Sequence, residues 1–172
     1  MTKKTTANKL GALATALADA MADGFGDLSP SAAAAVLTLR QTETLGTTEL
    51  AQVVGLSQPA CTRMVDRLVA DGLAQRRPAR GRTVPIALTE KGRREGELIQ
   101  ARRLAVLRTV TEGLDKKERK DLDRLLDRLL SAVAADGAAP HRACRLCDTR
   151  VCDGKGCPRL AGDAAPLPAP AE

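Results

Sequence analysis

The chain of 172 residues is almost free of aromatic side chains, with one Phe, no Tyr and no Trp. Proteins that hold single-stranded nucleic acid commonly stack its bases on aromatic rings, so this mode of binding is disfavoured. The hydrophobic fraction of 44% must then consist mainly of Ala, Leu and Val, which suit closely packed helices. We therefore expect a mainly α-helical protein.

Long apolar runs are also missing, and no hydrophobic segment follows the lysines of the opening MTKKTTANKL. The sequence thus predicts neither a membrane span nor a signal peptide, and we expect a cytoplasmic protein. Catalytic groups are equally scarce, since the only histidine is His141. Asp66 and Asp71 stand five positions apart on a predicted helix, where their side chains diverge. We predict that the protein is not an enzyme.

Basic charge is concentrated in one segment of the chain, whose net charge is +6. Residues 57–94 hold nine Lys or Arg against three Asp or Glu, whereas residues 95–136 hold nine of each. Such a local imbalance is better explained by a polyanionic partner than by an ordinary solvated face.

Helices are predicted on both sides of this segment, with Ser29, Thr47, Ser57 and Thr89 as N-caps. In order, the first helix ends before Gly24, the second ends at about Gln41, the third runs from Thr47 to Gly55, the fourth from Ser57 to Gly72, and the fifth from Glu90 to about Glu112. The sixth helix follows the Asp115–Glu118 capping pair. Its apolar stripe consists of Leu122, Leu125, Leu126, Leu129 and Val133. Between the fourth and fifth helices, residues 73–77 and 83–88 predict a hairpin with a basic tip. Pro85 lacks a ladder donor and suggests an edge strand or a bulge.

The helix SQPACTRMVDRLVADG places Cys61, Met64, Val65 and Leu68 on a single apolar face. Its short polar groups and arginines project elsewhere, as a helix that reads the DNA major groove requires. A short helix precedes it across a Gly-Leu-Ser link, which is the spacing of a helix-turn-helix. We expect Cys61 to be a small core residue, separate from the cysteines near the C-terminus.

The motifs T-x-E-L-A from Thr47, T-R-x-V-D-R-L from Thr62, D-G-L from Asp71 and L-T-x-x-G from Leu88 resemble the winged helix-turn-helix of the MarR family of transcriptional regulators. The resemblance covers about residues 10–135. It implies a homodimer with interlocked N- and C-terminal helices, in which each subunit reads half of a palindromic double-stranded DNA site. It also implies a small-molecule effector, since members commonly bind phenolic or other small aromatic compounds. We expect a repressor.

By the same resemblance, the residues that contact DNA are Ser57, Gln58, Pro59, Thr62, Arg63 and Arg67 on the reading helix, and Arg80 and Arg82 on the wing. The family's wing often carries an acidic residue shortly before its arginine, whereas RRPARGRT has none. On chemical grounds, Arg63 is the best candidate for a bidentate contact with guanine. Arg80 and Arg82 are better suited to phosphate or minor-groove contacts, which set affinity and its salt dependence.

Four more cysteines, Cys144, Cys147, Cys152 and Cys157, form a C-x2-C-x4-C-x4-C-P pattern with His141 upstream. A zinc ion held by the four thiolates is the first interpretation. An iron–sulfur cluster, a reversible thiol switch and an inert tail stay open. Since the cluster follows the last dimerisation helix, we expect its metal or redox state to modulate DNA affinity.

The sequence therefore predicts a mainly α winged helix-turn-helix protein in five parts: an N-terminal dimerisation helix (1–28), a DNA-binding lobe (29–89), C-terminal dimerisation helices (90–136), a cysteine cluster (137–160) and a disordered tail (161–172). The alternative is a zinc-dependent protein-interaction module for which DNA binding is secondary.

Overall fold

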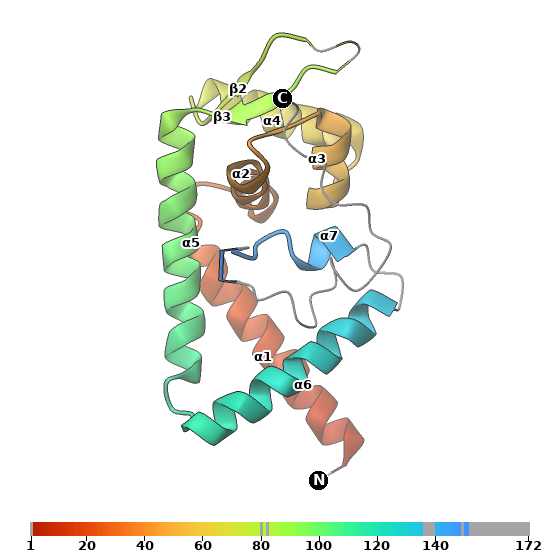
Figure 1. Ribbon diagram of the computed structural model, residues 1–172, viewed down its shortest axis with the longest axis vertical. Helices are drawn as coiled ribbons and strands as arrows, with labels where there is room; N and C mark the ends of the chain where they lie inside the picture. Colours follow the sequence, from red (N-terminus) through yellow and green to blue (C-terminus); the bar gives the residue numbers. More distant parts are fainter. Residues whose placement is uncertain (1, 80, 82, 136–139, 149, 152–172) are drawn as a thin grey trace.

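A buried helix, α2 (Pro30–Thr42), forms the centre of the fold (Figure 1). In this computed structural model, which describes residues 2–79, 81, 83–135, 140–148 and 150–151, every side chain from Ala32 to Leu39 is buried. A helix that is apolar on all sides requires neighbours on all sides. The neighbours of α2 are α3 (Thr47–Val54), α4 (Gln58–Ala70), α5 (Glu90–Thr111) and a small sheet.

The sheet has three antiparallel strands in the order β1-β3-β2, comprising β1 (Thr44–Leu45), β2 (Ala74–Arg76) and β3 (Ile86–Leu88). The predicted hairpin is present, and β1 is an additional strand that pairs Leu45 with Ile86. The expectation of an edge or a bulge at Pro85 was wrong, because β3 lies between the two other strands. Pro85 lies just before β3, where it needs no N–H donor. Its carbonyl oxygen accepts a hydrogen bond from the backbone N–H of Arg77 at 2.8 Å.

The long helices outside the lobe are α1 (Lys3–Asp23), α5 and α6 (Lys116–Ala135). Figure 1 shows α1 and α6 crossing below the lobe, at the end of α5 that is remote from the sheet. The only Phe of the chain lies just after α1. Phe25 is 3% exposed and packs with Ala33 and Leu37 of α2 and with Ile99 of α5. None of the helices within the described residues is long and apolar enough to cross a bilayer.

The helix ends follow the predicted capping chemistry except at Thr47 and at Ser57, which is the N-cap of α4 by position but makes no side-chain capping bond. Ser29 and Thr89 accept hydrogen bonds from the backbone N–H groups of Ala32 and Gly92, and Asp115 and Glu118 cap α6 reciprocally. Thr47, however, is the first residue of α3, and the N-cap is Gly46. A side chain at position 46 would collide with the Glu49 carboxylate and the Thr83 methyl group, which explains glycine there.

The chain returns to the lobe after α6 through the short helix α7 (Pro140–Ala143), which packs on α3. Leu146 packs against both core clusters, and Asp148 is only 5% exposed. Arg150 donates to both carboxylate oxygens of Asp148, at 3.0 and 2.8 Å. These hydrogen bonds outweigh desolvation and lower the pKa of Asp148 to about 2. Residues 140–148 and 150–151 are thus part of the folded structure, while the predicted tail (161–172) lies outside the described residues.

Candidate nucleic-acid interface

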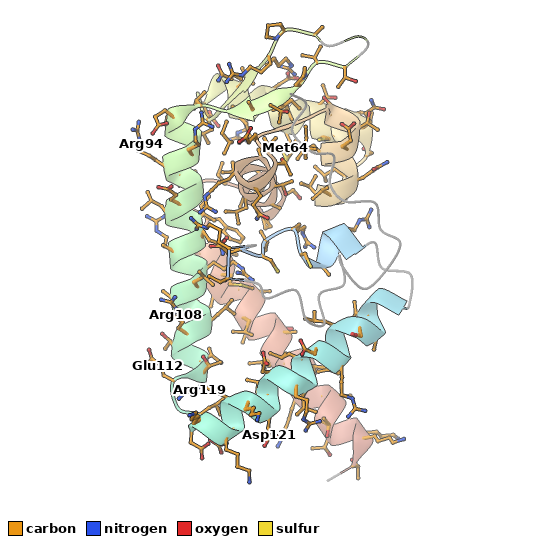
Figure 2. The ribbon with its side chains drawn as sticks, viewed as in Figure 1. Met64, Arg94, Arg108, Glu112, Arg119 and Asp121 are labelled. Atoms are coloured by element: carbon orange, nitrogen blue, oxygen red, sulfur yellow. The ribbon has the colours of Figure 1, made fainter. Side chains whose placement is uncertain are left out.

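Helix α4 separates a buried face from an exposed one, as its sequence predicts. Cys61 and Val65 are fully buried and Leu68 is 1% exposed. Met64, labelled in Figure 2, is half-buried and packs against the same core cluster. The remaining candidate side chains of α4 are exposed, namely Gln58, Pro59, Thr62, Arg63 and Arg67, together with Ser57 directly before the helix.

Burial also determines the chemistry of the cysteine in this helix. Desolvation raises the pKa of the Cys61 thiol above its ordinary value. Thiolate, the reactive form, is therefore suppressed, and Cys61 serves as the small core residue that the sequence predicts.

The N-terminus of α4 is held by contacts that leave its end open to solvent. Ser57 is the N-cap by position, but its side chain makes no capping hydrogen bond. Gln58 instead donates from Nε2 to Thr48 Oγ1 at 3.3 Å, which links α4 to the N-terminal end of α3. Thr62 donates from Oγ1 to the carbonyl oxygen of Gln58 at 3.0 Å. The partial positive charge of this end suits the approach of a phosphate group.

The two arginines of α4 lie in different surroundings. Arg63 lies on the side of the helix opposite its buried residues, where it is exposed. Arg67 lines a cleft of about 180 Å³ with Leu28, Asp71 and the half-buried Met64. Arg67 is therefore on the flank that faces the α1–α2 connection, and Arg63 is better placed to enter a groove.

An ion pair joins the reading helix to the wing. Arg76 Nη2 on β2 lies 2.6 Å from Asp66 Oδ1 on α4, with side chains 39% and 57% exposed. The wing sequence lacks an acidic residue of its own, and Asp66 supplies the carboxylate from the helix instead. Sequence reasoning placed both residues in the basic segment but missed their pairing, because no local pattern connects positions in different elements.

Exposed basic side chains continue from α4 onto the start of the wing, where Arg76 and Arg77 are both exposed. The predicted contact residues Arg80 and Arg82 lie outside the described residues. Lys91, near the start of α5, donates to the carbonyl oxygen of Asp71 at 2.8 Å and so fixes the end of α4 against α5. No local pattern in the sequence predicts this bond.

The cysteine cluster is only partly within the described chain. Cys144 and Cys147 lie in a turn in which the backbone N–H of Cys147 donates to the carbonyl of Cys144 at 2.9 Å, and both are partly buried. Cys152 and Cys157 lie outside the described residues. Among the residues that the structure describes, no three metal-ligating side chains gather in one place. The zinc, iron–sulfur and thiol-switch interpretations therefore remain predictions.

Comparison with known proteins agrees with this geometry. The MarR family model matches residues 28–80, which span α2, α3, α4 and the start of the wing. No curated protein matches the chain.

Solved structures with the same fold cover most of the chain. A MarR family protein from Bacillus stearothermophilus is 27% identical, with a TM-score of 0.67 over 75% of this chain and 95% of that chain. A probable transcriptional regulator from Pseudomonas aeruginosa is 28% identical, with a TM-score of 0.57 over 72% of this chain and 95% of that chain. The RV1404 protein of Mycobacterium tuberculosis, 23% identical, shares the fold with a TM-score of 0.68 over 77% of this chain and 94% of that chain.

The predicted fold class is therefore confirmed, with helices around a small antiparallel sheet in the arrangement of a winged helix. The matched segment contains the helix-turn-helix and its exposed reading face. The helix-turn-helix region, residues 28–80, therefore matches the MarR family, whose proteins are transcriptional regulators and not enzymes, and the resemblance that its motifs predict is confirmed.

Proposed function

We propose that the protein acts as a homodimer that binds a palindromic double-stranded DNA operator through α4 of each subunit, as a repressor. The observation that carries this proposal is the division of α4. Its apolar face is anchored in the lobe by Cys61, Val65 and Leu68, while Arg63 and Thr62 are exposed on its other sides. A firmly anchored helix with exposed polar groups is what direct readout in the major groove requires.

The long helices support the homodimer. Leu125, Leu126 and Leu129 on α6 are each 45% exposed, and Leu10 and Leu13 on α1 are 48% and 46% exposed. Apolar side chains exposed in this way on the faces of two long helices favour association. A second copy of the chain covers both faces and holds two reading helices at a fixed separation, about one helical turn or 34 Å on B-DNA.

DNA recognition is tested by selecting bound duplexes from a random pool. The affinity of the protein for the most enriched duplex is then measured at several salt concentrations. We expect a palindromic consensus and an affinity that falls steeply with salt. Enrichment of no sequence above the starting pool would contradict the proposal.

The homodimer is tested by sedimentation of a Leu126→Glu, Leu129→Glu double variant. We expect monomers, together with loss of binding to the full palindrome. Lys120→Glu is the matched control, because it adds the same charge on the polar side of α6. Dimers of unchanged strength in the double variant would rule out this interface.

We further propose that the tail holds zinc through Cys144, Cys147, Cys152 and Cys157. The supporting observation is the tight turn that contains both Cys144 and Cys147 and so holds them close together. Elemental analysis of the purified chain should give about one zinc per subunit. Visible absorption would favour the iron–sulfur alternative, and reversible disulfide formation without metal would favour the thiol switch.

A small molecule is the other proposed modulator. A cleft of about 680 Å³ separates the α1–α2 connection from α4 and α5, and its lining includes Arg67, Lys91 and Glu95. A ligand in this cleft would touch the reading helix directly. Release of the selected duplex on adding a compound library, with loss of the effect in Lys91→Ala, would test this site.

A further inference from the structure

The start of the cysteine segment packs against the DNA-binding lobe and against the part of α5 that adjoins it. Gln41, at the end of α2, donates from Nε2 to the carbonyl oxygen of Cys147 at 2.7 Å, across 106 positions of sequence. Leu146 packs against both core clusters, the second of which includes Ile99 of α5. Figure 1 shows α7 beneath α3, between the lobe and α6.

A second contact involves the turn of the helix-turn-helix itself. Gly55 ends α3 in the left-handed conformation, with φ of 75°. The side chain of Arg142 lies over this glycine so closely that a Cβ at position 55 would be 3.1 Å from its Nε. The segment therefore touches both the helix before the reading helix and the turn that orients it.

Hydrogen bonds within the segment and from the lobe hold the Cys144–Cys147 turn in one conformation. The backbone N–H of Cys147 closes the turn on Cys144, and the carbonyl of Cys147 accepts from Gln41. Directly after the turn, the buried Asp148 accepts from the backbone N–H of Arg150 at 3.0 Å as well as from its guanidinium. A C-x2-C pair held in one conformation loses less entropy on binding a metal than a flexible pair does.

We propose that zinc binding at Cys144 and Cys147 and docking of residues 142–148 on the lobe stabilise each other, so that the tail acts on DNA affinity through α2 and α3. The inference rests on the zinc site of the proposed function. Coupling of this kind is reciprocal, since the factor by which docking strengthens zinc binding equals the factor by which zinc strengthens docking. The route to DNA runs through α3, which Gln58 and Thr48 join to the reading helix.

The first test measures zinc affinity of the full chain by competition with a chromogenic chelator. Gln41→Leu removes the donor to Cys147, and we expect zinc to bind roughly five- to tenfold more weakly. Gln41→Glu keeps the shape but turns a carboxylate oxygen toward the carbonyl, so its loss should be larger. Gln52→Leu is the control, because Gln52 is exposed on α3 and should leave the affinity unchanged.

The second test follows docking without metal. Mass spectrometry of the zinc-free chain gives the alkylation rates of Cys144 and Cys147, and we expect them to rise several-fold in both Gln41 variants and not in Gln52→Leu. Circular dichroism checks that the variants are folded. Removing zinc from the unmodified chain should lower affinity for the selected duplex, and this dependence should vanish in Gln41→Glu.

The outcomes separate the two proposals. Zinc binding by the unmodified chain with unchanged affinity and alkylation in the Gln41 variants would overturn the coupling and leave the metal site standing. No zinc binding by the unmodified chain would remove the metal site and the coupling with it. DNA binding that ignores zinc would refute the route through α3.

Discussion

Arg76 on the wing strand and Asp66 on the reading helix form an ion pair 2.6 Å long, which joins the two elements proposed to touch DNA. Both side chains are substantially exposed, so the pair contributes about 0–1 kcal/mol to folding. Its larger effect is electrostatic, because Asp66 carries a negative charge on the surface that faces a polyanion.

We predict that Asp66→Asn strengthens binding to all duplexes at low salt and steepens the salt dependence, since Arg76 then becomes available to phosphates. Arg76→Ala should have the opposite effect, because it leaves the carboxylate uncompensated. Fluorescence anisotropy at several salt concentrations measures both. Asp121→Asn on α6, a carboxylate remote from the lobe in Figure 2, is the control and should leave affinity unchanged.

Arg63 is predicted to carry base discrimination. Arg63→Ala should weaken binding to the selected operator by about 1–3 kcal/mol at one base pair and leave non-specific binding nearly unchanged. Arg108→Ala is the control, because Arg108 points outward from α5 far from the lobe (Figure 2). A competition assay with single-base operator variants measures the base preference of each variant protein. If Arg63→Ala weakened binding to every duplex equally, Arg63 would be reassigned to phosphate contact.

Glycine is required where α5 passes the start of β2. A Cβ on Gly92 would collide with the backbone carbonyl of Leu73, which cannot move without displacing the strand. Gly92→Ala should therefore lower the free energy of unfolding by about 1–3 kcal/mol. Gly96→Ala should cost less, since the closest atoms there include the flexible side chain of Arg40 at 3.2 Å.

Gly11→Ala completes the series, because a Cβ at that position of α1 meets nothing within 4 Å. It should stabilise the protein by up to about 1 kcal/mol through helix propensity. Urea denaturation at constant protein concentration ranks the three variants. A Gly92→Ala variant as stable as Gly11→Ala would show that the packing of α5 on Leu73 is wrong.

The two kinds of cysteine should differ in reactivity. Burial raises the pKa of Cys61, so that its thiol stays protonated at a pH where an exposed thiol begins to ionise. In the zinc-free chain, iodoacetamide at pH 8 should label Cys144 and Cys147 well before Cys61, as peptide mass spectrometry would show. Because the unfolded chain ionises this thiol first, the contribution of Cys61 to stability should diminish as the pH rises above about 8.5. Labelling of Cys61 at the rate of the tail thiols would mean that α4 is not anchored as described.

Several elements could be predicted from the sequence because their signals are local. Apolar spacing in α4 predicted the burial of Cys61, Val65 and Leu68, because a helix repeats its faces every three to four residues. Capping groups near Ser29, Thr89 and Asp115 marked helix starts, since those groups satisfy backbone donors within one turn. The reading helix could be recognised for the same reason.

The contacts that join distant parts of the chain could not be predicted in this way and are known from the fold alone. The pairing of β1 with β3, the Arg76–Asp66 ion pair and the bond from Gln41 to Cys147 each connect segments with no periodic relation in sequence. The error at Pro85 has this origin, because the position of a strand within a sheet depends on which other strand arrives beside it. The packing of α7 on α3 and of Leu146 on the core likewise depends on shape and burial, and it brings Cys144 and Cys147 close to the helix-turn-helix.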